Sequence, residues 1–146
     1  MSELHDVSDR ADLELLLGAF YRRVLADDVL RPVFVDVMHL DLARHLPVVT
    51  GFWERVLFQS GDYRGQAMEV HRGVHRQVPL TAEHFQRWLE LWGETLGVHF
   101  RGPVADQAQA HARRMAGVFL RNLTEADGGR RALPLAAAQG RTAPEA

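Results

Sequence analysis

Four residues that can hydrogen-bond or bind a metal fall where a helix would face an apolar interior. They are Tyr21, His45, His71 and Trp88. A buried tyrosine hydroxyl or indole N–H needs a hydrogen-bond partner, and a neutral imidazole is a common metal ligand. If these side chains meet around one cavity, they could hold a small polar ligand or a metal ion. We therefore treat them as the candidate functional residues.

His71 is the strongest candidate for a metal ligand, because imidazole binds several transition metals at neutral pH. His75 follows it at a spacing of i, i+4, and such a pair could bind zinc from one helix face. The zinc-protease pattern needs a glutamate directly after the first histidine, and Arg72 stands there instead. The alternative for His71 is a histidine packed in a loop and hydrogen-bonded to backbone.

His45 and Trp88 also have ordinary structural interpretations. His45 shares an apolar face with Val49 and Phe52, and a lone histidine there is usually a satisfied core residue. Trp88 continues a stripe that starts at Phe85, which indicates core packing. A buried indole N–H still needs an acceptor, so Trp88 could donate to a bound ligand.

Composition narrows the class of protein. The chain has 146 residues, 47% of them hydrophobic, which suits one domain with a substantial core. Its formal net charge is −2, so we expect no nucleic-acid partner. It has no cysteine, which excludes disulfides and iron–sulfur clusters and is compatible with a cytoplasmic location. Since no apolar stretch is long enough to span a bilayer, we expect no membrane partner either.

Apolar residues recur every three or four positions, which predicts helices and no strand. Ser8 is the expected N-cap of the first helix, and Pro32 should turn the chain after it by keeping Arg31 out of helical backbone. The second helix should begin close to His45, because a proline such as Pro47 is tolerated in a first turn. We expect this helix to end at residues 60–62.

The second half of the chain is predicted to contain one short helix and two longer ones. Residues 67–76 form at most a short helix, and Thr81 should cap the next one. Gly102 and Pro103 break the chain and begin the last helix. From residue 124 onward glycine, alanine, arginine and proline dominate. We therefore expect a domain over residues 1–123 and a flexible tail over 124–146.

Several segments together resemble the truncated haemoglobins, specifically their third (P-type) group. The resemblance spans roughly residues 10–123. The matching segments are Phe20-Tyr21-Arg22-Arg23-Val24, Arg31-Pro32-Val33-Phe34, His45 through Gly51-Phe52-Trp53, Gly61-Asp62-Tyr63-Arg64-Gly65-Gln66-Ala67-Met68, His71, and His84-Phe85-Gln86-Arg87-Trp88-Leu89. The first two groups usually carry Gly-Gly pairs in their loops. The Gly128-Gly129 pair here lies in the predicted tail, which agrees with the third group.

The resemblance implies an all-α, two-over-two helical sandwich around one haem b, with His71 as the proximal iron ligand. It places Tyr21, His45 and Trp88 on the distal side, with Val49 one helical turn beyond His45. Phe34 would pack against the haem face. The full set of expected cofactor-binding residues is Tyr21, Phe34, His45, Val49, Phe52, Met68, His71 and Trp88.

The implied function is reversible binding of O₂ and of related ligands such as CO, NO and cyanide. NO detoxification or peroxidase-like chemistry would use the same pocket with an unidentified reductase as partner. Two alternatives stay open. In one, the chain is a haem-free helical interaction or sensor module. In the other, His45 itself ligates the iron, or His75 replaces His71.

Overall fold

The computed structural model describes residues 3–61, 71, 75 and 80–132, with the backbone alone for 124–132. Every regular element in this part of the chain is a helix, as the sequence predicted. The elements in order are α1 (Arg10–Leu25), the π-helical segment η1 (Pro32–Val37), α2 (Leu42–Phe58), α4 (Ala82–His99) and α5 (Pro103–Ala132).

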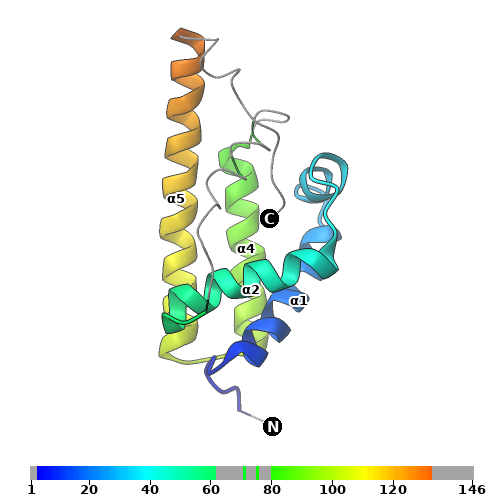
Figure 1. The fold of residues 1–146 in the computed structure, drawn as a ribbon, viewed down its shortest axis with the longest axis vertical. Helices are drawn as coiled ribbons and strands as arrows, with labels where there is room; N and C mark the ends of the chain where they lie inside the picture. The colour runs from blue at the N-terminus through cyan, green and yellow to red at the C-terminus, as the bar shows by residue number, and fades with distance from the viewer. Residues whose placement is uncertain (1–2, 62–70, 72–74, 76–79, 133–146) are drawn as a thin grey trace.

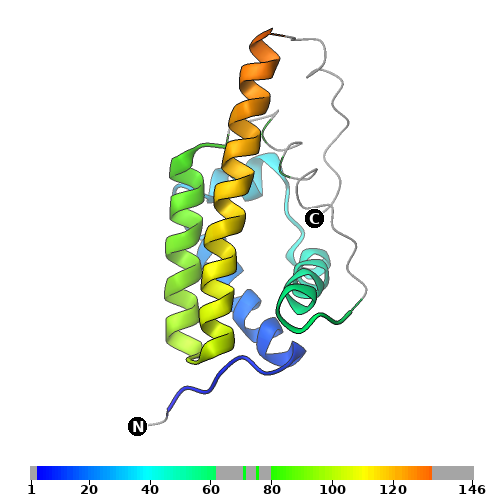
Figure 2. The same ribbon diagram turned by 90° about the vertical axis from the view of Figure 1, so that its left-hand side faces the viewer.

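The four long helices form two pairs, a two-over-two arrangement. In one pair α1 packs against α2, and in the other α4 runs antiparallel to α5 (Figures 1 and 2). α1 also packs against α4, and this contact joins the pairs, while α2 has a smaller contact with α5. The core lies between the pairs and is dominated by large side chains such as Phe20, Trp53 and Trp92.

The start of α1 differs from the prediction by one residue. Asp9 is the N-cap, because its Oδ1 accepts a hydrogen bond from the Asp12 backbone N–H at 3.0 Å. Ser8 was the wrong choice. Its backbone N–H and hydroxyl both donate to Asp12 Oδ2 instead. A carboxylate and a serine hydroxyl cap helices about equally well, so composition alone did not separate the two candidates.

The prediction that Pro32 keeps Arg31 out of helical backbone was wrong. Arg31 has φ −54° and ψ −44°, and Pro32 begins the π-helical segment η1. A proline in a first helical turn loses no hydrogen bond, because its missing N–H would have had no intrahelical partner. η1 carries Phe34 and lies over the end of α1.

α2 begins at Leu42, earlier than expected, and contains Pro47 in its interior. The Asp41 carbonyl accepts from the backbone N–H groups of Arg44 and His45, so the first turn is complete before the proline is reached. His45 therefore lies in the first turn of α2. The helix ends at Phe58, and Gln59 follows in left-handed backbone with φ 55°, close to the predicted end.

The caps of α4 and α5 use different chemistry. Thr81 caps α4 as predicted, and His84 returns the contact by accepting from the Thr81 N–H through Nδ1 at 3.0 Å. α5 begins at Pro103, also as predicted. Its cap comes from far away in the sequence, because Asp6 accepts from the backbone N–H groups of Val104 and Ala105, both at 2.8 Å.

The predicted tail over 124–146 and the predicted short helix over 67–76 are described only in part. α5 continues to Ala132, so the last helix passes the boundary expected at residue 123. Residues 133–146 lie outside the described part. The same holds for most of the short helix expected over 67–76, although His71 and His75 are both in helical backbone.

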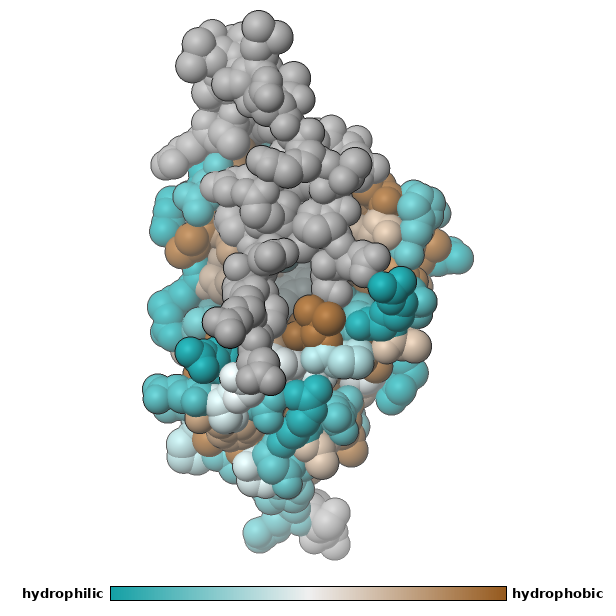
Figure 3. Space-filling model, in the orientation of Figure 1, coloured by the Kyte–Doolittle hydropathy of each residue, from teal (hydrophilic) through white to brown (hydrophobic). Residues whose placement is uncertain are grey.

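The described surface is mainly polar. Hydrophilic side chains make up much of the described surface that is visible in Figure 3, and hydrophobic residues show there as separate groups. Large exposed apolar residues are scattered over several elements, as with Leu15 on α1, Val48 on α2 and Val98 on α4. Among the described residues, no helix is both long and apolar enough to cross a membrane.

Candidate ligand-binding site

The first part of the site is a buried contact between α1 and α2. Tyr21 Oη and His45 Nε2 are 2.9 Å apart, and the two residues are 5% and 6% exposed. Their rings meet edge to face at 4.9 Å between centroids. Burial raises the pKa of the Tyr21 hydroxyl, which therefore keeps its proton at neutral pH. The two polar groups from two helices converge, an arrangement that the sequence left open.

Aromatic side chains surround this polar pair. The Phe34 ring of η1 lies 6.0 Å from the Tyr21 ring, and the Phe20 ring lies 5.1 Å from it. Phe20 in turn meets Trp88 of α4 edge to face at 5.3 Å. Val49 is partly buried against the same core. Tyr21 thus contacts both His45 and Phe34, whereas Trp88 reaches this group through Phe20 and Val49 packs against the same core.

Phe52 lies nearer to α5. Its ring contacts Trp53 at 5.5 Å and His111 of α5 at 6.3 Å. It is partly buried and packs against the same core as Val49, one helical turn away. Met68, the remaining expected cofactor contact, lies outside the described residues.

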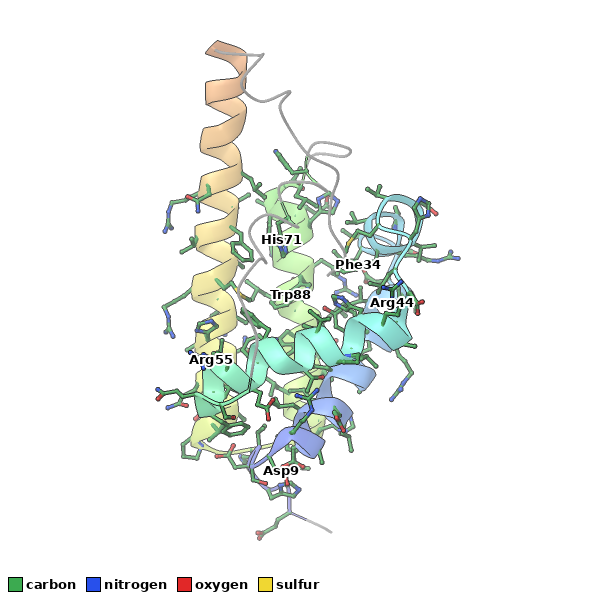
Figure 4. The ribbon with its side chains drawn as sticks, in the orientation of Figure 1. Asp9, Phe34, Arg44, Arg55, His71 and Trp88 are labelled. Carbon is green, nitrogen blue, oxygen red and sulfur yellow. The ribbon has the colours of Figure 1, made fainter. Side chains whose placement is uncertain are left out.

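His71 lies on the side of α4 and α5. Its ring is 4.5 Å from Phe119 of α5 and 6.4 Å from Phe85 of α4, and the residue is partly exposed. Figure 4 shows His71 and Trp88 along α4, with Phe34 on the side of η1. The His71 imidazole therefore lies among aromatic side chains of α4 and α5.

His75 is a poorer metal ligand than His71. It is only 4% exposed, and its Nδ1 accepts a hydrogen bond from the Leu80 backbone N–H at 2.7 Å. An accepting Nδ1 places the proton of the neutral ring on Nε2, so this tautomer offers neither lone pair to a metal. Within the described residues, no three His, Asp or Glu side chains gather as a metal-binding group.

Two residues near the site were not singled out in the sequence. Asp27 follows α1 and is buried, and its Oδ1 accepts from Arg87 Nε of α4 at 2.6 Å. Its Oδ2 accepts from the backbone N–H groups of Val29 and Leu30, both at 3.1 Å. Burial opposes its ionisation, but the bonds from Arg87 and the backbone outweigh that effect and hold the pKa of Asp27 below its usual value.

We call the buried Asp27 carboxylate, with its bonds to Arg87 and to the backbone, a carboxylate anchor. It holds the end of α1 and the start of η1 against α4, and so positions Tyr21 and Phe34. The short Asp27-to-Leu30 turn has a local sequence signal, because Asp often bonds to backbone N–H groups two or three residues ahead. No local sequence signal identifies Arg87 as the partner of Asp27, because the two residues are far apart in the sequence. A pair α1–α2 that contains the buried tyrosine–histidine contact, joined through α1 and α4 to a pair α4–α5, defines a small all-α, two-over-two helical protein.

Comparisons with known proteins agree with that class. No family model matches the chain. A curated relative, the group 3 truncated hemoglobin ctb of Campylobacter jejuni, is 27% identical over 107 residues, which cover 71% of this chain and 82% of the relative. The crystal structure of the group III truncated hemoglobin from Campylobacter jejuni matches with a TM-score of 0.75 at 24% identity, over 83% of this chain and 95% of that one. The predicted resemblance to group III truncated haemoglobins and the all-α two-over-two fold are both confirmed.

Proposed function

We propose that this chain binds haem and, through it, reversibly binds O₂ and related small ligands. The observation that carries the proposal is the buried contact between Tyr21 Oη and His45 Nε2, at 2.9 Å in otherwise apolar surroundings. Burying polar groups costs free energy, and a polar ligand that accepts a hydrogen bond from the Tyr21 hydroxyl gives this arrangement a use. The likeness to truncated haemoglobins supports haem as the cofactor.

The residues present fit a haem. His71 offers an imidazole beside the aromatic rings of Phe85 and Phe119, whereas His75 is engaged by Leu80. Imidazole is the usual proximal ligand in globins. The sequence has no cysteine, so thioether attachment of the macrocycle is not available and haem b is the form that we propose. Phe34, Val49, Phe52 and Met68 would supply apolar contacts to its faces and edge.

The distal residues would act on the bound ligand as hydrogen-bond donors. When bound, haem supplies an open coordination position on its iron, at which a small ligand can attach. Tyr21 keeps its proton because burial raises its pKa, so its hydroxyl can donate to a polar ligand. Trp88 can donate through its indole N–H. His45 orients the Tyr21 hydroxyl, and together these groups would slow the escape of O₂ more than that of the less polar CO.

The same pocket can serve several reactions. We propose O₂, CO, NO and cyanide as ligands, with NO detoxification or peroxidase-like turnover as further uses. Each of these uses needs electrons from outside the chain, so we propose a reductase as partner. The reducing cytoplasm would supply such electrons, and we place the protein there.

Haem titration tests this proposal. Purified protein is mixed with haemin and followed by its visible spectrum, then reduced and exposed to CO. We expect a sharp Soret band that saturates at one haem per chain and shifts cleanly with CO. A protein that stays colourless would contradict the proposal and support the haem-free helical module. A six-coordinate ferrous spectrum that becomes five-coordinate in His45→Ala would instead assign His45 as an iron ligand.

A further inference from the structure

Three tryptophan rings form a continuous stacked column through the core. Trp88 and Trp92 of α4 stack at 5.6 Å between ring centroids with planes 5° apart. Trp92 then stacks on Trp53 of α2 at 4.7 Å and 18°. The Trp53 ring meets His111 of α5 edge to face at 5.6 Å. The column therefore runs from a proposed ligand-contacting residue to a histidine on a third helix.

The middle of the column is buried, whereas Trp88 and His111 at its two ends are partly exposed. Trp92 and Trp53 are 0% and 1% exposed, so neither is open to molecules in solution. His111 is partly exposed and lies against Phe52 as well as Trp53. Burial and the nearby charge of Arg114 hold the pKa of His111 below its usual value, so its ring is uncharged at neutral pH. An uncharged ring does not oppose a positive charge on Trp53.

Packing alone accounts for buried tryptophans, but two features suit this column to electron transfer. Indole is readily oxidised by one electron, and parallel rings in contact exchange an electron quickly because their π-orbitals overlap. The indole N–H of Trp92 donates to the Ala108 carbonyl at 3.4 Å. An amide carbonyl is too weak a base to take the proton, so a Trp92 that loses an electron keeps its proton. The charge then stays free to move along the column.

Phe20 separates the column from the other oxidisable side chain of the site. Its ring lies 5.1 Å from Tyr21 on one side, and 5.3 Å from Trp88 and 5.0 Å from Trp92 on the other, in edge-to-face contacts. A phenylalanine ring is much harder to oxidise than indole or phenol. The arrangement therefore favours movement of charge along the three indoles over transfer to Tyr21.

We infer that Trp88, Trp92 and Trp53 carry electrons between the haem pocket and the surface at His111, where a phenol-type donor too large for the pocket can supply them. The inference rests on the proposed function, since a hydroperoxide in the haem pocket is the oxidant. One hydroperoxide accepts two electrons and two protons, its O–O bond breaks, and it leaves as an alcohol and water. Two phenols each lose one electron and one proton and leave as phenoxyl radicals.

The location of oxidative damage tests the path. Ferric, haem-loaded protein receives one equivalent of hydrogen peroxide without a donor, and peptide mass spectrometry locates added oxygen. We expect oxidation at Trp53, accompanied by a tryptophanyl radical in freeze-quenched electron paramagnetic resonance spectra. Added phenol should suppress both. Haem-free protein treated in the same way should keep Trp53 intact, because that ring is shielded from solution.

Two variants interrupt the column at different points. Trp92→Phe should confine oxidation to Trp88 and abolish it at Trp53. Trp53→Phe removes the far end, and should move the damage to Trp88 and Trp92 and abolish turnover of a bulky phenol. Phe100→Leu is the matched control, because Phe100 is a buried aromatic outside the column. The ferrous–CO spectrum shows in each case that the variant is folded and loaded with haem.

The outcomes separate the inference from the proposed function. If the protein binds haem and CO but peroxide leaves Trp53 intact, the path is wrong and the haem assignment stands. Oxidation of Tyr21 alone, or oxidation of Trp53 that persists in Trp92→Phe, would also overturn the path. Failure to take up haem would overturn both the path and the proposed function.

Discussion

Among the described residues, two side-chain contacts that hold the helices in place differ in kind. The contact of Asp27 with Arg87 joins a charged carboxylate to a charged guanidinium, and both carboxylate oxygens are engaged. The contact of Tyr21 with His45 joins an uncharged hydroxyl to an imidazole ring, and both side chains lie in apolar surroundings. The first ties the turn after α1 to α4 and the second joins α1 to α2, and they suit different roles.

The difference follows from hydrogen-bonding capacity. An ionised carboxylate only accepts, and Asp27 uses its oxygens to hold backbone and Arg87 in place. Asp6 acts in the same manner on the start of α5. A hydroxyl has one donor and two lone pairs, so Tyr21 keeps capacity for a ligand while it contacts His45. We therefore assign stability to the carboxylate anchors and ligand binding to the neutral pair.

Asp27→Ala should give the largest loss of stability among the polar contacts. It leaves Arg87 without this partner and the N–H groups of Val29 and Leu30 without an acceptor, so we expect unfolding to become easier by about 2–3 kcal/mol. Urea denaturation measures this. Asp28→Ala, which removes an exposed neighbouring carboxylate, is the control. If both variants lost equally little free energy of unfolding, the stabilising role of Asp27 would be contradicted.

Asp6→Ala should have a smaller effect, of about 1–2 kcal/mol, because it removes the cap of α5. Gly102→Ala tests the same contact between Asp6 and the start of α5, because the added methyl group would collide with Asp6. A Cβ at Gly102 would lie 2.5 Å from Asp6 Cγ, and the Gly102 φ of 150° disfavours a side chain. Thermal unfolding should show a lower midpoint for both variants, whereas Glu3→Ala at an exposed position should leave it unchanged.

The two anchors also predict how stability depends on pH. For Asp6, as for Asp27, burial opposes ionisation but hydrogen bonds outweigh it, so its pKa lies below the ordinary value of 3.8. The unfolded chain then takes up protons at a higher pH than the folded chain does. The stability from both groups is present above pH 3.8 and is lost as the pH falls through their folded pKa values. Denaturation at a series of pH values should show this decline, and Asp27→Asn should make it shallower.

Tyr21→Phe should change stability least, by about 1 kcal/mol or less, because it removes one neutral hydrogen bond. Its effect on function should be larger. Loss of a donor to bound O₂ should speed O₂ dissociation roughly tenfold, the factor that corresponds to about 1.4 kcal/mol. Stopped-flow kinetics measures this rate, with CO dissociation as an internal control that should change less. A variant that is strongly destabilised but has unchanged O₂ kinetics would reverse the two assigned roles.

Local chemistry explains which parts of the fold could be predicted. Thr81 as a cap and the start of the last helix at Pro103 depend on neighbouring residues, and the structure has both. The errors at Ser8, Arg31 and the start of α2 concern single helix ends, where two adjacent residues compete or a proline can be accommodated in more than one place. The three- and four-residue spacing of apolar side chains predicted the helices themselves correctly, because that pattern is averaged over many residues.

Contacts between distant residues could not be read in the same way. Tyr21 and His45 were chosen by type and face, but only the packing of α1 on α2 brings their polar atoms to 2.9 Å. The partners of Asp6 and Asp27, and the stacking of Trp53 on Trp92, depend on how whole helices cross. The roles of His71, Phe34, Val49, Phe52, Met68 and Trp88 toward a cofactor remain predictions.

The most direct test of the account compares haem binding by His71→Ala and His75→Ala. The account predicts that His75→Ala, like the unaltered protein, takes up one haem and gives a ferrous–CO spectrum typical of a histidine-ligated globin. His71→Ala should lose that spectrum and recover it when imidazole is added to fill the vacated position. A normal spectrum in His71→Ala together with its loss in His75→Ala would contradict the account and assign the iron to His75.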